Sequence, residues 1–114
     1  GTLWAGNGTT LYRSSDGGTT AAGWTSVKAF GSGKPVKGIG LAKNDPEFLT
    51  VVCDDSTPGD GSVWVSADAV TFELIPNLAN DGWNAAYFSQ VDPNLVYIVG
   101  DDDTTRPVMA KLAP

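Results

Sequence analysis

Histidine is missing from this chain of 114 residues, and cysteine occurs only once. Without histidine the chain lacks the commonest general base, so neither Ser-His-Asp nor Cys-His catalysis can be assembled within it. The single cysteine, Cys53, excludes an internal disulfide, and its place in the apolar run FLTVVC predicts a buried, inert thiol. No apolar run approaches the roughly 20 residues that a helix needs to cross a bilayer, so we expect no membrane partner.

Basic residues are also scarce: seven Lys and Arg face 13 Asp and Glu, which gives a net charge of −6. Binding of nucleic acid needs a clustered basic surface, so we expect no nucleic acid partner. Any catalysis within this chain would have to rest on carboxylates or tyrosines.

The residues that are plentiful indicate an all-β protein. Fourteen Gly and seven Pro separate short runs rich in Thr, Val and aromatic residues, and no window keeps the apolar period of a helix. Two segments, GLAKNDPEFLTVVCDD and YFSQVDPNLVYIVGDD, carry the same pattern 47 residues apart, and LYRSSD returns as VWVSAD 52 residues further on. The sequence is therefore a repeat of about 47 residues with loops of variable length.

Each repeat divides into four short strands, with Asp45-Pro46 and Asp92-Pro93 between the first strand and the second. The expected strands are 2–6, 10–14, 23–29, 37–43, 48–53, 62–66, 71–75, 84–90, 95–99 and 107–112. Four-stranded units of this length are typical of β-propeller blades. Ten strands make about two and a half blades, with boundaries near 31–36 and 77–83, so we expect residues 1–114 to be one propeller segment that is incomplete alone.

The stretch SSDGGTTAAGW resembles the Asp-box of BNR-repeat β-propellers, Ser-x-Asp-x-Gly-x-Thr-Trp, with three residues inserted before the Trp. SADAVTF resembles a degenerate second copy, and WAGNGTTLYRSSDGG is similar to blades of xyloglucanase-type glycoside hydrolases. The resemblance implies architecture more than activity, because Asp-boxes also occur in sialidases, sortilin-type receptors, photosystem assembly factors and phage proteins. Ser and Asp side chains accept hydrogen bonds from nearby backbone amides, which suits a turn. The residues expected to lock two hairpins in this way are Ser14, Asp16, Gly18, Thr20, Trp24, Ser66, Asp68, Thr71 and Phe72.

Antiparallel strands alternate in direction, so both Ser-x-Asp turns are expected on one face of the segment and the irregular loops on the opposite face. Loops on a rigid scaffold are a usual place for function. On that face an exposed Trp83 would stack on a sugar ring while Asp and Asn side chains bind its hydroxyl groups. A core position on an inner strand is the alternative for Trp83. The expected carbohydrate-binding residues are Trp83, Asn84, Asp54, Asp55, Asp101 and Asp102.

The same acidic loops offer two other kinds of site. Asp55 and Asp102 are candidates for the acid and base of glycoside hydrolysis, in which the two carboxyl groups would lie roughly 5 to 9.5 Å apart. The chain does not match the sequence around either catalytic acid of the xyloglucanases that it resembles. Sialidases bind the substrate carboxylate with three Arg, whereas this chain has only Arg13 and Arg106. Oxygen ligands of the kind that Ca²⁺ prefers are offered by Asp54, Asp60, Asp101 and Asp103.

These observations predict a non-catalytic binding or assembly module of an Asp-box β-propeller, extracellular or on a virion surface. Its expected partners are a carbohydrate or a protein surface, together with further blades from a longer chain or from a homo-oligomer. No cofactor is required, and Ca²⁺ is a candidate ion. The alternatives are a portion of a xyloglucanase-like glycoside hydrolase and a purely structural subunit.

Overall fold

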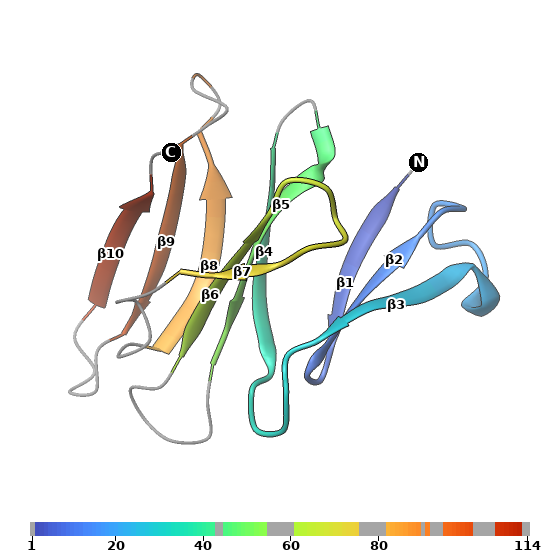
Figure 1. Cartoon of the computed structure of the whole chain (residues 1–114), viewed down its shortest axis with the longest axis horizontal. Coiled ribbons are helices and arrows are strands. Elements are labelled where there is room, and N and C mark those ends of the chain that lie inside the picture. The colour runs from blue at the N-terminus through green and yellow to red at the C-terminus, as the bar shows by residue number, and fades with distance from the viewer. Residues whose placement is uncertain are drawn as a thin grey trace.

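The computed structural model describes residues 2–42, 45–54, 61–75, 82–89, 91, 95–101 and 107–112. These residues form an all-β structure of three antiparallel sheets, none of which closes on itself (Figure 1). The all-β prediction is therefore confirmed. No helix in the described part of the chain is long and apolar enough to span a membrane.

Each sheet is a meander in which strands consecutive in the chain are neighbours. Sheet 1 has the order β1-β2-β3, sheet 2 the order β4-β5-β6-β7 and sheet 3 the order β8-β9-β10. Every neighbouring pair is antiparallel. The elements are β1 (Leu3–Asn7), β2 (Thr10–Ser14), the 3-10 turn η1 (Ala21–Gly23), β3 (Trp24–Ala29), β4 (Val36–Ala42), β5 (Asp45–Cys53), β6 (Ser62–Ser66), β7 (Glu73–Leu74), β8 (Gly82–Phe88), β9 (Val96–Asp101) and β10 (Pro107–Leu112).

Several predicted strand boundaries differ from those observed, among them those of the expected strands 48–53 and 71–75. The dipeptide Asp45-Pro46 is not a connection between strands, because β5 begins at Asp45, which lies opposite Ala42 after a shift in register. Proline is tolerated near the start of a strand, where its missing N–H disturbs the ladder least. The expected strand 71–75 shrinks to Glu73–Leu74, and at its start the Thr71 amide donates to Asp68 at 2.8 Å and not to a neighbouring strand. The Ile75 amide still donates to the Val63 carbonyl at 2.9 Å.

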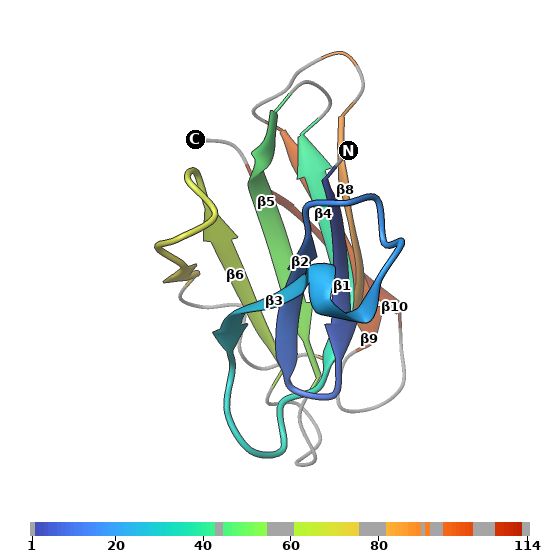
Figure 2. The ribbon, with the colours of Figure 1, turned by 90° about the vertical axis from the view of Figure 1, so that its right-hand side faces the viewer.

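The three sheets lie one behind another in the view of Figure 2. Side chains between them form two apolar clusters. Between sheets 1 and 2, Phe30 lies 5.4 Å from Trp64, measured between ring centroids. Between sheets 2 and 3, Phe48 lies 5.2 Å from Phe88 on the same measure. Both faces of sheet 2 are therefore covered by another sheet, whereas sheets 1 and 3 are each covered by sheet 2 on one face.

Glycines let the first strands of sheets 2 and 3 approach closely. A Cβ atom at Gly38 would lie 2.8 Å from the Cα of Ala85, and one at Gly40 would lie 3.0 Å from the carbonyl oxygen of Ala86. Both contacts are with backbone, which cannot move aside as a flexible side chain would. The spacing Gly-x-Gly in β4 is thus a packing feature that faces β8.

Candidate functional site

The predicted loop face has a hydrogen-bonded framework that joins sheet 1 to sheet 2. It includes the β1–β2 turn and the β3–β4 connection, which lie at the lower edge of the view in Figure 1. The Val36 amide donates to the Gly8 carbonyl at 2.9 Å, and the Asp54 amide donates to the Pro35 carbonyl at 3.0 Å. Sheet 1 thus holds the start of sheet 2 in place at this face.

The acidic residues predicted on this face are only partly within the described structure. Asp54 is half-buried at the end of β5, and Asp101 ends β9 opposite Gly82. Asn84 is exposed on β8. The predicted acid and base, Asp55 and Asp102, and two of the predicted calcium ligands, Asp60 and Asp103, lie outside the described residues. Within the described ranges, no three Asp, Glu, His or Cys side chains lie close enough together to hold a metal ion.

Trp83 lies in the core and not on the surface of the loop face. Its side chain is 1% exposed and packs in the cluster between sheets 2 and 3, with Val52, Val63 and Ile98 among its neighbours there. A sugar needs an exposed ring face on which to stack. The structure therefore corrects the assignment of Trp83 as a carbohydrate contact and favours the core position on an inner strand.

Cys53 is also buried, at the end of β5. Burial raises the pKa of its thiol to about 11, against the smaller opposing effects of a hydrogen bond with Ser62 and the charge of Lys34. The thiolate is the reactive form of cysteine, so this thiol is unreactive near neutral pH.

The first Ser-x-Asp turn, residues 14–24, is held by side chains that bond to backbone amides. The Ser14 hydroxyl, which is fully buried, donates to the Asp16 carboxylate at 2.8 Å and accepts from the Gly18 amide at 2.9 Å. The other carboxylate oxygen of Asp16 accepts from the Thr20 hydroxyl at 2.7 Å, and the Thr19 amide donates to the first at 3.2 Å. These are bonds of the kind that the residue types predict for a hairpin lock.

The segment inserted in this turn packs against the same carboxylate. Residues Ala21–Gly23 form η1, and the Gly23 amide donates to the Thr20 hydroxyl at 3.0 Å. A Cβ atom at Gly23 would lie only 2.4 Å from a carboxylate oxygen of Asp16. Gly17 and Gly18 have φ angles of 71° and 77°, in the region that favours glycine.

The second Ser-x-Asp turn, residues 66–72, has the same Ser–Asp pair, but some of the groups that donate hydrogen bonds to it are different. The Ser66 hydroxyl donates to Asp68 at 3.2 Å and accepts from the Ala69 amide at 2.9 Å, while Asp68 accepts from the amides of Val70 and Thr71. Ala69 has a φ of 60°, where the first turn has Gly17. Its methyl group is buried in the cluster between sheets 1 and 2.

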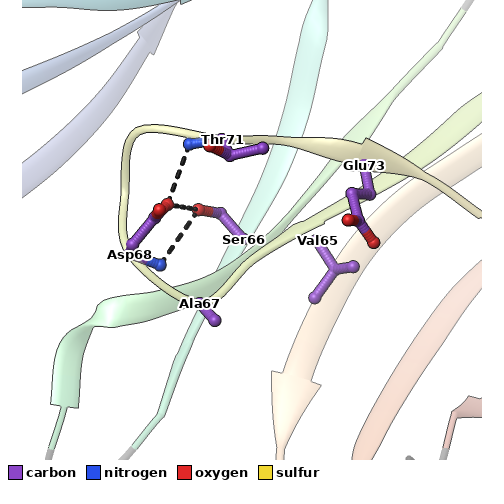
Figure 3. A pocket seen from close by; sticks show the side chains of 6 residues that line it. All are labelled: Val65, Ser66, Ala67, Asp68, Thr71 and Glu73. Carbon is purple, nitrogen blue, oxygen red and sulfur yellow. Dashed lines mark hydrogen bonds between the residues drawn. The ribbon is translucent and has the colours of Figure 1, made fainter.

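A hollow of about 360 Å³ lies beside the second turn and is lined by Val65, Ser66, Ala67, Asp68, Thr71 and Glu73 (Figure 3). The Asp68 carboxylate and the Ser66 hydroxyl point toward each other in it, and both are already bonded within the turn. The hydrogen bonds from the Thr71 and Val70 amides lower the pKa of Asp68, so it is ionised at neutral pH. The hollow follows from the shape of the turn, and we assign it no ligand.

The outer face of sheet 1 carries an apolar groove that sequence reasoning missed. Ala5, Asn7, Tyr12, Ala21 and Trp24 line a volume of about 310 Å³ on the face turned away from sheet 2. None of these side chains is charged, and Tyr12 and Trp24 are both half-buried. The repeat could have indicated this groove, because Tyr12 is equivalent to the aromatic residue Trp64, which lies 52 residues later in the chain.

Sheet 3 has a comparable outer face at the opposite end of the stack. Tyr87 lies directly across from Tyr97, and Ala85 lies across from Val99. Tyr87 is 62% exposed. The two ends of the stack therefore both present aromatic and aliphatic side chains.

The chain matches no protein-family model and no curated protein sequence.

Proposed function

We propose that this chain is a non-catalytic assembly module whose two outer sheet faces stack against further sheets of the same kind. The observation that carries the proposal is the repeat itself. Each outer face carries residues whose equivalents in sheet 2 lie between two sheets. The further sheets would belong to other copies of this chain.

The outer face of sheet 1 corresponds to the face of sheet 2 that packs on sheet 1. Tyr12 is equivalent to Trp64, which is covered by Phe30 at 5.4 Å and by the Lys28 ammonium at 5.2 Å from its ring centre. Trp24 is equivalent to Phe72, which meets Phe30 edge-on at 6.2 Å. In sheet 1 the same two positions lie on an open groove.

The outer face of sheet 3 corresponds to the face of sheet 2 that packs on sheet 3. The pair Tyr87–Tyr97 lies 47 residues after the pair Gly40–Thr50, and both are direct cross-strand partners. Gly40 lies against the backbone of β8. On its other side Tyr97 is paired with Lys111 of β10. Aromatic side chains are enriched at the buried centre of protein interfaces, so a head-to-tail contact of sheet 3 with sheet 1 is the expected arrangement.

The mass of the protein in solution tests this proposal. We expect the chain to form assemblies at high concentration and Tyr87→Glu to return it to a monomer, because a charge cannot be buried unpaired at a sheet interface. Val91→Glu is the matched control, since Val91 is 96% exposed in the segment between β8 and β9 and its replacement should leave the mass unchanged. A wild-type chain that stays monomeric at all concentrations, or an equal effect of both variants, would contradict the proposal.

Carbohydrate binding is a second candidate, and the groove on sheet 1 is the observation that favours it. Tyr12 and Trp24 offer ring faces and Asn7 offers an amide, which is the chemistry of a saccharide site. Stacking of a further sheet would cover this groove, so the two functions compete for one surface. Glycan-array binding that is lost in Tyr12→Leu but kept in Tyr97→Leu would favour the saccharide.

A further inference from the structure

An Asn-Gly dipeptide lies where β1 turns into β2. Asn7 is the last residue of β1 and is paired with Thr10, and Gly8 and Thr9 form the turn between them. Asn7 and Gly8 are both exposed. Gly8 has a φ of 59°, and a Cβ atom placed on it would meet no heavy atom within 4 Å. The backbone nitrogen that follows Asn7 is therefore not shielded by a side chain of its own residue, and water has access to it.

Asparagine is chemically labile because its side-chain amide can react with the backbone nitrogen that follows it. Here the Gly8 nitrogen would bond to Cγ of Asn7, and the bond from Cγ to the side-chain nitrogen would break, so that ammonia leaves with the Gly8 proton. Water then opens the cyclic imide. Addition of water at the side-chain carbonyl gives aspartate, and addition at the backbone carbonyl gives isoaspartate. Water is the only other reactant, and no group is oxidised or reduced.

Comparison with two other sites shows why this dipeptide is the reactive one. Asp16 also precedes a glycine with a positive φ, but its carboxylate is ionised at neutral pH and accepts hydrogen bonds within the first Ser-x-Asp turn. A carboxylate anion resists attack by a nucleophile. Asn84 is exposed as well, but it lies within β8 and is followed by Ala85, whose side chain hinders the backbone nitrogen. Asn7 combines an uncharged amide with a following glycine at the end of a strand.

Asn7 also belongs to the groove on the outer face of sheet 1. Its side chain lines this groove together with Ala5, Tyr12, Ala21 and Trp24. Asn7 and Ala5 are two residues apart on β1, so their side chains point to the same face. Both products of the reaction add a negative charge at this position. Covering that charge with a further sheet, without a partner for it, would oppose stacking.

We propose that Asn7–Gly8 is a site of spontaneous deamidation and that the reaction prevents stacking at the outer face of sheet 1. The second part rests on the proposed function, because the charge opposes assembly only if another copy covers that face. The isoaspartate product also adds a carbon atom to the backbone of the turn, where the Gly8 carbonyl accepts from the Val36 amide at 2.9 Å. The chain would thus lose its ability to assemble as it ages.

Peptide mapping of the whole chain by mass spectrometry, before and after prolonged incubation, tests the first part. Exchange of NH₂ for OH changes the peptide mass, and isoaspartate is identified by its methylation with an isoaspartyl methyltransferase. We expect Asn7 to react at least about tenfold faster than Asn84 in the same sample, because glycine leaves its nitrogen accessible. Asn7→Gln is the matched variant and should stay unmodified, since its longer side chain would have to close a larger ring. Equal rates at Asn7 and Asn84 would overturn the proposal.

The masses of two variants in solution test the second part. Asn7→Asp carries the charge of the product, and we expect it to need at least about tenfold higher concentration to assemble than Asn7→Gln, which should behave as the wild type. Equal assembly of the two variants would overturn the regulatory role even if Asn7 reacts. A wild-type chain that never assembles would contradict the proposed function and the regulatory role together, whereas the rate at Asn7 decides on the modification site in either case.

Discussion

The two Ser-x-Asp turns share a Ser–Asp pair and an amide donor three residues after the aspartate, and they differ in the other donor to the carboxylate. In both, a buried serine hydroxyl donates to an aspartate carboxylate two residues on, at 2.8 Å in the first turn and 3.2 Å in the second. In the first turn the carboxylate accepts further hydrogen bonds from a threonine hydroxyl and a backbone amide, whereas in the second it accepts them from two backbone amides. The pair is therefore sufficient to define the hairpin, and its environment decides which substitutions the turn can accept.

The largest effect is expected from Gly23→Ala in the first turn. The new methyl group would displace the Asp16 carboxylate and break its hydrogen bonds, which we expect to cost about 2 kcal/mol of unfolding free energy. Denaturant unfolding measures this cost. In an Asp16→Ala background the same substitution should cost little, because the atoms that it displaces are gone. An equal cost in both backgrounds would mean that the carboxylate is not the cause.

A smaller change in unfolding free energy is expected from substitutions at the position where each turn has a positive φ. Gly17→Ala has open space around it and should cost about 1 kcal/mol from backbone strain alone. The reverse change, Ala69→Gly, relieves similar strain but removes a buried methyl group worth about 0.8 kcal/mol, so it should be close to neutral. Unfolding midpoints in denaturant give both values. A clear gain in stability for Ala69→Gly would show that the methyl group contributes little packing.

The smallest effect is expected from titration of the two aspartates. The Thr20 and Ser14 hydroxyls chiefly lower the pKa of Asp16 below its ordinary 3.8, whereas the Thr71 and Val70 amides chiefly lower that of Asp68. A pKa that is lower in the folded state stabilises the fold above the ordinary value, and this stabilisation is lost as the pH falls below about 4. The unfolding midpoint should therefore be steady at neutral pH and decline in acid.

Replacing the threonines distinguishes the two mechanisms. Thr20→Val removes a hydroxyl donor and should raise the pKa of Asp16, as read from the NMR titration of its carboxyl carbon. Thr71→Val keeps the donating amide, so the pKa of Asp68 should not change. If both substitutions shifted the neighbouring aspartate equally, the contrast between hydroxyl and amide donors would be wrong.

The sequence predicted the order of the ten strands because turn residues and the repeat mark where strands end. It could not predict how β7 is shortened, since that depends on which amides Asp68 binds. It also left Trp83 undecided between surface and core, because an inner strand in a stack of sheets lacks a simple alternation of polar and apolar residues. The aromatic groove was missed for a related reason: Tyr12 resembles an ordinary sheet residue and Trp24 was assigned to the Asp-box turn, and only the repeat places both on an end face of the stack.

The hydrogen bond that crosses from sheet 1 to sheet 2 at the loop face has a consequence for how the chain unfolds. The Val36 amide at the start of β4 donates to the Gly8 carbonyl between β1 and β2. In a linear array the coupling between nearest neighbours sets the cooperativity. Loss of sheet 1 would leave the Val36 amide to water and uncover the apolar cluster that the two sheets share, so sheets 1 and 2 should unfold in one transition and not as independent units.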